Sequence, residues 1–233
     1  MRRNILLFIS LCVVGCAMMY AQQMPGLLQK GKADTQDCKA WVDEQLSEMS
    51  LKEKIGQLFI HTVAPLQTQR NKNNIYAAIK EYKVGGLLFS SGQLSNQVLL
   101  TNYAQSLAEV PLFITFDGEW GLAMRLKGTP RFPRNRVLGC IQDNELLYEY
   151  GKEVARQCKE IGVQINFAPV ADVDVNPRNP VINTRSFGGD PRNVAQKVVL
   201  MLVVWRMEGY CLSVNIFRGM EIRKWILIRR YRF

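Results

Sequence analysis

Short apolar runs alternate with longer amphipathic stretches along most of this chain, and this alternation restricts the possible folds more than any other feature. The apolar runs cover residues 58–62, 85–90, 112–116 and 164–170, and helical patterns cover 37–49, 74–82, 95–108 and 144–161. Ser50 lies three residues before Glu53, a capping-box spacing that predicts the start of a further helix. Runs that are apolar on both faces are typical of parallel strands joined by helical crossovers. The sequence therefore predicts an α/β fold.

Polar clusters follow the last two apolar runs and favour a barrel over an open sheet. Asp117-Gly118-Glu119-Trp120-Gly121 comes directly after 112–116, residues 166–173 overlap the fourth run, and a third cluster follows at 183–188. In a barrel of repeated β/α units, the functional groups lie at the carboxyl ends of the strands. We therefore expect an incomplete TIM (β/α)8 barrel, comprising roughly its first four strands.

The texture of the sequence changes at Leu200. An apolar run at 200–205 opens a tail in which seven Lys or Arg residues accompany only two Glu, so half of the net charge of +10 lies in residues 200–233. The preceding body is only mildly basic, which argues against a nucleic-acid partner. A chain of 233 residues with 48% hydrophobic side chains is long enough for one domain, and we expect its boundary at 199–200.

The first 21 residues have the pattern of an export signal. Arg2 and Arg3 precede an apolar stretch over residues 5–14 that is too short to span a bilayer as a helix. Two processing routes are open, namely cleavage after Ala21 or lipoprotein processing at Cys16. Both predict an exported protein of the periplasm or cell envelope, and the second adds a lipid anchor at Cys16 as the only membrane attachment.

Cysteine and histidine are too few and too scattered to build a metal site. Outside the signal and the tail, the cysteines are Cys38, Cys140 and Cys158, an odd number at wide spacing, so we expect buried or idle thiols. His61 is the only histidine, and we expect it in the core at a strand end or in a loop. The sequence predicts neither a metal nor a cofactor.

Several spaced motifs resemble the N-terminal barrel domain of the family 3 glycoside hydrolases. They are, in chain order, the stretch 49–58, Val84-Gly85-Gly86, an Asp-x-Glu-x-Gly block from Asp117 with Arg125 eight residues on, the stretch 166–173, and Arg185-Ser186-Phe187-Gly188 followed by Asp190-Pro191. The resemblance covers about residues 40–199, and several motifs in the right order are far more specific than any single one. Within the family, the chain looks most like the bacterial β-N-acetylglucosaminidases, a group of β-N-acetylhexosaminidases.

The resemblance implies that Asp117, Arg125 and Arg185 bind the carbohydrate substrate. A carboxylate accepts hydrogen bonds from neighbouring sugar hydroxyls, and a guanidinium donates to several oxygens at once. The structural alternative is that Asp117 caps a loop while the two arginines pair with carboxylates at the barrel mouth. The family pattern further implies that Glu119 and Asp172 support the loop and the strand.

The resemblance also implies that the reacting groups are missing, so that no catalytic residue is present in this chain. Retaining hydrolysis needs a nucleophile and a proton donor on either side of the glycosidic bond. In the N-acetylglucosaminidases of the family, the donor is a His paired with an Asp, soon after a Lys-His-Phe-Pro-Gly-His-Gly-Asp-Thr motif, and the nucleophile is a later Asp. No histidine follows Val199. Trp120 either stacks on a sugar face or packs.

The tail from 200 to 233 is compatible with the family sequence read in another frame. When each triplet is read one base earlier, Met207 with Glu208 forces Gly, Met220 with Glu221 forces Gly, and Trp225 with Ile226 forces Asp. Degenerate positions between them permit the Lys-His-Phe-Pro-Gly-His-Gly-Asp-Thr motif. We therefore hypothesise a single-base loss near codons 199–200 and an out-of-frame tail, which resequencing of the locus tests.

Three functions follow from these features. The first is a glycosidase that cleaves terminal β-linked N-acetylglucosamine from oligosaccharides or murein fragments, present here as an inactive truncated remnant. The second is a family 3 β-glucosidase with the same Asp and Arg residues but a different subsite for the second carbon of the sugar. The third is a non-enzymatic exported protein whose basic tail binds an anionic membrane surface.

Overall fold

The computed structural model describes residues 35–176, 178–209 and 211–212. The predicted export signal with Cys16, and the tail beyond Leu212, lie outside the described residues. The chain divides into two compact units, Met1–Lys54 and Ile55–Phe233.

The N-terminal unit contains helix α2 (Thr35–Glu48), and α3 (Leu51–Gly56) begins in it. The backbone N–H of Ser50 donates to Oε2 of Glu53 over 2.9 Å, and the N–H of Glu53 donates to Oγ of Ser50 over 3.3 Å. This reciprocal pair is a capping box, which satisfies donors that the first turn of a helix leaves open. The predicted helix start at Ser50 is confirmed.

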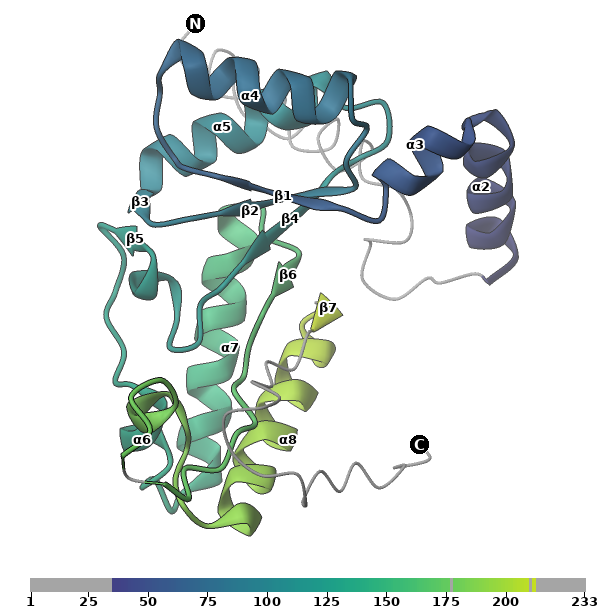
Figure 1. The fold of residues 1–233 in the computed structure, drawn as a ribbon. Coiled ribbons are helices and arrows are strands. Elements are labelled where there is room, and N and C mark those ends of the chain that lie inside the picture. The colour runs from purple at the N-terminus through teal and green to yellow at the C-terminus, as the bar shows by residue number, and fades with distance from the viewer. Residues whose placement is uncertain (1–34, 177, 210, 213–233) are drawn as a thin grey trace, which may run out of the picture. The chain divides into compact units, whose positions relative to one another are not determined.

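The second unit is built on a parallel sheet whose strands follow one another in chain order. The strands are β1 (Ile60–Val63), β2 (Gly86–Phe89), β4 (Phe113–Phe116), β6 (Ile165–Asn166) and β7 (Cys211–Leu212), and their order in the sheet is β1-β2-β4-β6-β7. Neighbouring strands pair in parallel, with Ile60 opposite Gly86 and Thr115 opposite Ile165. Figure 1 shows the successive strands side by side. Sequential parallel pairing is the arrangement expected for part of a (β/α)8 barrel, and the predicted fold class is confirmed.

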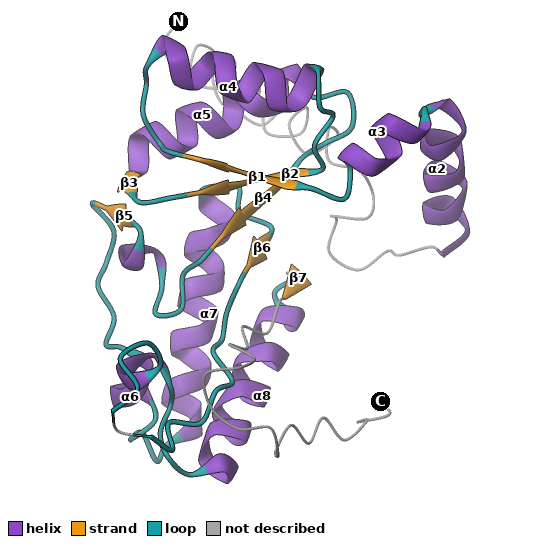
Figure 2. Ribbon diagram, viewed as in Figure 1, coloured by secondary structure: helices purple, strands orange, loops and turns teal. Residues whose placement is uncertain are grey.

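A long helix separates each pair of neighbouring strands in this sheet. These helices are α4 (Gln69–Lys80), α5 (Leu94–Leu107), α7 (Asn144–Glu160) and α8 (Pro191–Met207), as Figure 2 shows. Smaller elements lie in the connections: the paired short strands β3 (Gly92–Gln93) and β5 (Leu126–Lys127), the helices η2 (Leu122–Met124) and η3 (Asn183–Arg185), and α6 (Asn135–Leu138). Residues of the strands and of the long helices form one buried apolar cluster.

The sheet differs from the sequence prediction at β6. We expected a strand over residues 164–170, but β6 ends at Asn166. The chain then leaves the ladder, and Pro169 could not have continued it as a donor because proline has no backbone N–H. The apolar residues after β6 serve a buried loop instead, in which Ala168 and Val170 are 3% and 0% exposed.

Helix α8 continues through the change of texture at Leu200. The predicted boundary at 199–200 therefore lies inside a helix, and Met201, Val204 and Trp205 beyond it are all buried. A Cβ atom on Gly151 of α7 would lie 3.1 Å from Sδ of Met201, so the missing side chain lets the two helices approach closely. After α8, β7 adds a fifth strand, beyond the roughly four that we expected. Whether these residues are out of frame stays a prediction.

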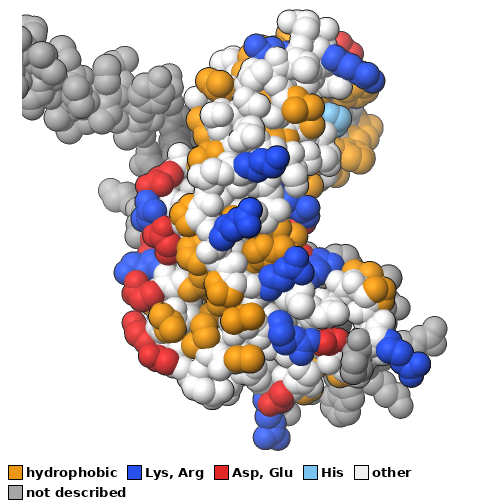
Figure 3. Space-filling model, turned by 90° about the vertical axis from the view of Figure 1, so that its left-hand side faces the viewer, with side chains coloured by type: hydrophobic (Ala, Val, Ile, Leu, Met, Phe, Trp, Pro, Cys, Tyr) orange, Lys and Arg blue, Asp and Glu red, His pale blue; other side chains and the backbone are white. Residues whose placement is uncertain are grey.

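The surface carries apolar side chains near one edge of the sheet. Leu58, Phe59 and Ile60 are 82%, 61% and 42% exposed, and β1 is paired on one side only among the described strands. On the face turned toward the viewer in Figure 3, Lys and Arg side chains are scattered between apolar patches rather than gathered into one field. None of the described helices is long and apolar enough to cross a membrane.

Candidate functional site

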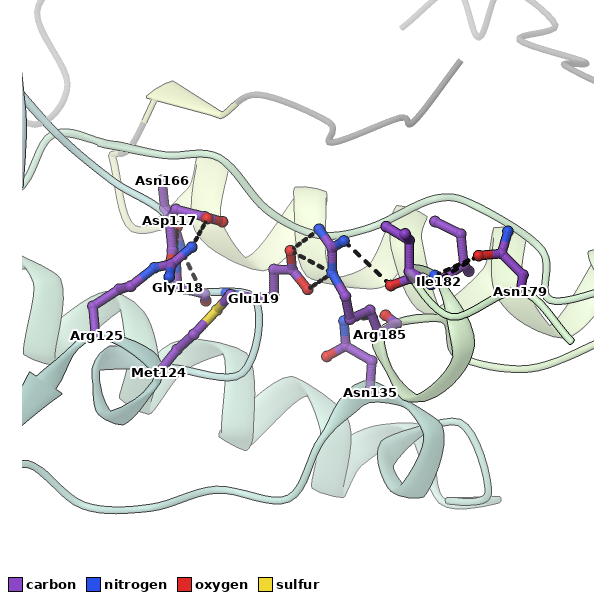
Figure 4. A network of polar contacts seen from close by, with 11 residues as sticks. Asp117, Gly118, Glu119, Met124, Arg125, Asn135, Asn166, Asn179, Ile182 and Arg185 are labelled. Atoms are coloured by element: carbon purple, nitrogen blue, oxygen red, sulfur yellow. Dashed lines mark hydrogen bonds and ion pairs between the residues drawn. The ribbon is translucent and has the colours of Figure 1, made fainter. Parts of the chain in front are cut away.

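The loops that follow β4 and β6 are joined by one asparagine side chain. Asn166, the last residue of β6, is 1% exposed, and its Oδ1 accepts from the backbone N–H of Gly118 over 2.9 Å. Its Nδ2 donates back to the carbonyl oxygen of Gly118 over 3.2 Å. Figure 4 shows this amide beside the start of the loop after β4. The pair of bonds fixes the backbone next to Asp117 at the carboxyl end of the sheet.

Asp117 forms an ion pair with Arg125 and keeps one oxygen without a partner. Nη2 of Arg125 pairs with Oδ2 of Asp117, and its Nε donates to the backbone oxygen of Asp117 over 3.3 Å. Oδ1 of Asp117 is buried and has no hydrogen-bond partner among the described residues. A buried carboxylate oxygen without a donor is costly to maintain. This oxygen is therefore an acceptor that a ligand hydroxyl can satisfy.

Glu119 and Arg185 form a second, more deeply buried pair. Nε of Arg185 donates to Oε1 and Oε2 of Glu119 over 3.0 and 2.9 Å, and Nη2 also binds Oε1. The Glu119 side chain has no exposed surface, whereas the Arg185 side chain is 19% exposed. The hydrogen bonds that Arg185 donates to Glu119 raise the pKa of Arg185, so the guanidinium keeps its charge at any ordinary pH. Arg185 is thus a fixed cation beside the loop after β4.

These contacts bear on the predicted roles in different ways. The structure brings both predicted arginines onto carboxylates, Arg125 onto Asp117 and Arg185 onto Glu119 (Figure 4). Glu119 accepts the hydrogen bonds of Arg185, and the supporting role that the family pattern implies for it stays a prediction. The backbone oxygen of Asp172 accepts from Oγ of Ser186 over 2.6 Å. That Asp117, Arg125 and Arg185 bind a sugar stays a prediction.

Trp120 packs against the side chain of Arg134, the N-cap residue of α6. The guanidinium carbon of Arg134 lies 5.1 Å from the centroid of the Trp120 ring, a cation–π distance. Nη1 of Arg134 also donates to Oγ1 of Thr184 over 2.9 Å. One side of the indole is therefore covered by protein.

Two asparagines outside the sequence motifs hold η3 and the turn that precedes it. Nδ2 of Asn135 donates to the backbone oxygen of Arg185 over 2.8 Å. Oδ1 of Asn179 accepts from the N–H groups of Val181 and Ile182 over 2.8 and 3.2 Å. Asn135 and its partner are 50 residues apart, so no local pattern contained their contact. The sequence Asn176-Pro177-Arg178-Asn179-Pro180 is rich in residues that favour turns, and this composition was the available signal for the role of Asn179.

The cysteines and the histidine form no part of the hydrogen-bond network described above. Cys158 is buried, which raises the pKa of its thiol to about 12, whereas Cys140 is exposed and Cys38 is intermediate. All three of these cysteines are free, and the expectation of a buried thiol holds for Cys158 but not for Cys140. His61 lies within β1 and is exposed, so the expectation of a core or loop position is wrong. In the part of the chain that the structure describes, no three His, Cys, Asp or Glu residues are grouped to hold a metal.

A comparison with known protein families identifies the family to which this sequence is similar. The model of the glycosyl hydrolase family 3 N terminal domain matches residues 50–219, which is most of the chain. The match runs past Leu200 and includes α8 and β7. The Asp117 and Arg185 loops lie within it.

Named relatives agree with the family match. The chain is 27% identical over 180 residues to a beta-N-acetylglucosaminidase/beta-glucosidase of Cellulomonas fimi, an alignment that covers 77% of this chain and 31% of the relative. It is 32% identical over 157 residues to the beta-hexosaminidase LpqI of Mycobacterium tuberculosis, covering 63% and 37%. The chain thus spans about a third of the length of these relatives.

A solved structure shows the same fold. The family 3 β-N-acetylglucosaminidase of Paenibacillus sp. str. FPU-7 superposes with a TM-score of 0.66 at 30% identity, covering 74% of this chain and 34% of that one. Fold, motif order and family match agree over the same residues. This chain belongs to glycosyl hydrolase family 3 and carries part of the N-terminal domain of that family.

Proposed function

We propose that this chain is the sugar-holding part of a glycosidase that releases terminal β-linked N-acetylglucosamine from oligosaccharides or murein fragments. The observation that carries the proposal is the state of Asp117, whose Oδ2 pairs with Arg125 while its buried Oδ1 has no partner among the described residues. Such a carboxylate is oriented to accept a sugar hydroxyl. The names of the relatives from Cellulomonas fimi and Mycobacterium tuberculosis support the choice of sugar.

Asp117 suits binding better than nucleophilic attack. Its negative charge is already balanced by Arg125, and a carboxylate engaged in an ion pair is a weaker nucleophile than a free one. Arg185, held on Glu119, adds a fixed cation whose remaining polar surface suits oxygen atoms of a sugar. In the proposed enzyme, the tail read in its other frame supplies the motif that precedes the proton donor of the retaining mechanism, and the nucleophile is an Asp much later in the frame-restored sequence.

A β-glucosidase is the second candidate, because the relative from Cellulomonas fimi carries both names. The carboxylate and the two guanidinium groups of this site bind hydroxyl oxygens of either sugar. None of them is specific for an acetamido group. The choice between the two sugars therefore rests on the similarity to the hexosaminidases.

The cellular setting is part of the proposal. The charged and then apolar pattern of residues 1–21 supports export to the periplasm or cell envelope, and Cys16 is the proposed site of a lipid anchor. Labelling of the expressed chain with radioactive palmitate tests the anchor, with Cys16→Ser as the control. Incorporation that persists in the Cys16→Ser variant excludes it.

A paired hydrolysis assay tests the proposed function. This chain and the frame-restored gene product are each incubated with an aryl N-acetyl-β-glucosaminide and an aryl β-glucoside. We expect no turnover by this chain and a preference of the restored protein for the glucosaminide. Turnover by this chain contradicts the assignment of the reacting groups to the other frame. A preference of the restored protein for the glucoside favours the second candidate.

A further inference from the structure

The N-cap residue of α6, Arg134, and the first two residues of that helix hold the three residues of η3, which include Arg185. The contacts are Arg134 Nη1 to Thr184 Oγ1 at 2.9 Å, Asn135 Nδ2 to the Arg185 backbone oxygen at 2.8 Å, and Arg136 Nη2 to the Asn183 backbone oxygen at 3.1 Å. Three consecutive side chains thus bind three consecutive residues of the loop. Two of the three acceptors are backbone oxygens, so these bonds hold the path of the chain as well as one side chain.

Arg136 differs from its two neighbours because it also forms an ion pair with a nearly buried carboxylate. Its Nη2 pairs with Oδ2 of Asp174, whose side chain is 9% exposed. The backbone N–H of Asp174 in turn donates to the oxygen of Gly188 over 2.9 Å. Arg136 therefore links the connection after β4, the loop after β6 and the start of η3 through a single guanidinium group.

The residue that Arg136 holds has an unfavourable backbone conformation. Asn183 has a φ of +33°, in the region that L residues seldom adopt. Backbone in such regions persists only where the surroundings enforce it. The hydrogen bond from Arg136 to the oxygen of Asn183 is a direct restraint on this turn. Two residues further on, the turn delivers Arg185 to Glu119.

We propose that Arg136 is a positioning residue, which fixes η3 so that the Arg185 guanidinium stays on Glu119 and faces the sugar site. The relevance of this to sugar binding rests on the proposed function. Loss of Arg136 releases the turn at Asn183, and Arg185 then samples orientations away from Glu119. Sugar affinity falls although no residue that touches the sugar has changed.

The two segments stay in contact without Arg136, which makes the idea testable. A Cβ atom on Gly139 would lie 1.7 Å from the backbone oxygen of Phe187, so the backbones themselves touch. Nδ2 of Asn193 also donates to the oxygen of Gly139 over 2.9 Å. The Arg136→Gln variant is therefore expected to keep the fold and to lose only the local order of η3.

Nuclear magnetic resonance of the Arg185 Nε–H group in the full chain measures this order without any ligand. The signal is assigned by its loss in Arg185→Lys. We expect a sharp, slowly exchanging signal in the wild-type chain, its loss or broadening in Arg136→Gln, and its retention in the matched control Arg134→Gln. An unchanged signal in Arg136→Gln overturns the proposal, as does a wild-type chain without an ordered signal.

Rescue separates positioning from a general loss of structure. Glycine adopts positive φ without steric cost, so Asn183→Gly in the Arg136→Gln background is expected to recover much of the Arg185 signal. Failure of that rescue, with the fold intact by circular dichroism, counts against the mechanism. If Arg136→Gln does not fold, Arg136→Gln combined with Asp174→Asn leaves no unpaired buried charge, and the same predictions apply to it.

A titration with N-acetylglucosamine distinguishes this proposal from the proposed function. We expect about tenfold weaker binding in Arg136→Gln than in the wild-type chain, the equivalent of about one hydrogen bond to a charged group. If the Arg185 signal behaves as expected but the wild-type chain binds no sugar, positioning by Arg136 stands and the proposed function fails. Equal affinity of both chains, with the signal lost in the variant, overturns the claim that the order of Arg185 governs sugar binding.

Discussion

The two carboxylate–arginine pairs of the site differ in burial, and this difference separates their roles. The Asp117 and Arg125 side chains are 24% and 33% exposed, whereas Glu119 is fully enclosed beneath Arg185. A partly exposed pair is open to a ligand. An enclosed pair holds the loop and contributes to folding, because the fully buried Glu119 carboxylate is compensated by the charge and hydrogen bonds of Arg185.

Loss of the enclosed carboxylate therefore destabilises the fold. We expect Glu119→Ala to lower the free energy of unfolding by about 3 kcal/mol, since it leaves the Arg185 charge without its partner. Urea denaturation measures the change. Glu109→Ala is the matched control, because Glu109 is 66% exposed beside Lys80 and Lys83 and its loss costs less than about 1 kcal/mol. Equal costs for the two variants would contradict the assignment.

Among single residues, the sequence predicted those that carry motifs, Glu119 among them, but not the distant side chains that hold η3. Asp117, Arg125 and Arg185 were found through spaced motifs that resemble one family. Arg136 was not found, because its partners Asp174 and Asn183 lie 38 and 47 residues away. Only the folded chain brings a helix after β4 against a loop after β6.

Among the elements, α7 and α8 show that packing continues past the change of sequence texture. Met201, Val204 and Trp205 have the spacing of one helix face, and all three are buried. Their periodicity was present in the sequence. It was obscured because the following tail is rich in arginine. The alternation of strands and helices before Leu200 was predictable from apolar periodicity, whereas the early end of β6 depends on loop contacts.

Two methionines of α8 test this packing directly. Met201 is 3% exposed and Met207 is 59% exposed. We expect Met201→Ala to cost about 2–5 kcal/mol of stability, because it leaves a cavity against α7, and Met207→Ala to cost less than about 0.5 kcal/mol. Thermal or urea unfolding of both variants measures the difference. A Met201→Ala variant as stable as Met207→Ala would show that the helix does not pack here.

The stability of the fold is also expected to depend on pH through Glu153 of α7. Hydrogen bonds from Arg156 and then Gln157 lower the pKa of Glu153 from 4.5 to about 2. A lowered folded-state pKa stabilises the fold above the unfolded-state value, and this contribution is lost as the pH falls from about 4.5 to 2. We expect the wild-type chain to melt slightly above Glu153→Gln at pH 6 and at the same temperature near pH 2. A difference that persists at pH 2 would refute this.

For the whole molecule, the unpaired edges of the described sheet are the features that most favour self-association. Among the described strands, β1 and β7 each have one neighbour, and exposed Phe59 and Ile60 lie beside the β1 edge. Unpaired strand edges with apolar side chains promote association. The chain spans about a third of the length of the relatives it matches.

Self-association of the chain follows from this edge. We expect light scattering to rise with protein concentration and to fall in Phe59→Lys, because a charge at the edge opposes pairing. Tyr76→Lys is the control, since Tyr76 is exposed to 47% on α4, away from the edge. An equal effect of both substitutions would indicate association through general surface charge instead.

The proposed binding of a sugar depends on Asp117, Arg125 and Arg185. Calorimetric titration of the full chain with N-acetylglucosamine tests it most directly, with Asp117→Asn as the comparison. We expect saturable binding by the wild-type chain and binding at least about tenfold weaker in Asp117→Asn. The variant loses the ion pair with Arg125 and a charged hydrogen-bond acceptor. Absence of binding, or equal affinity in the two chains, would contradict it.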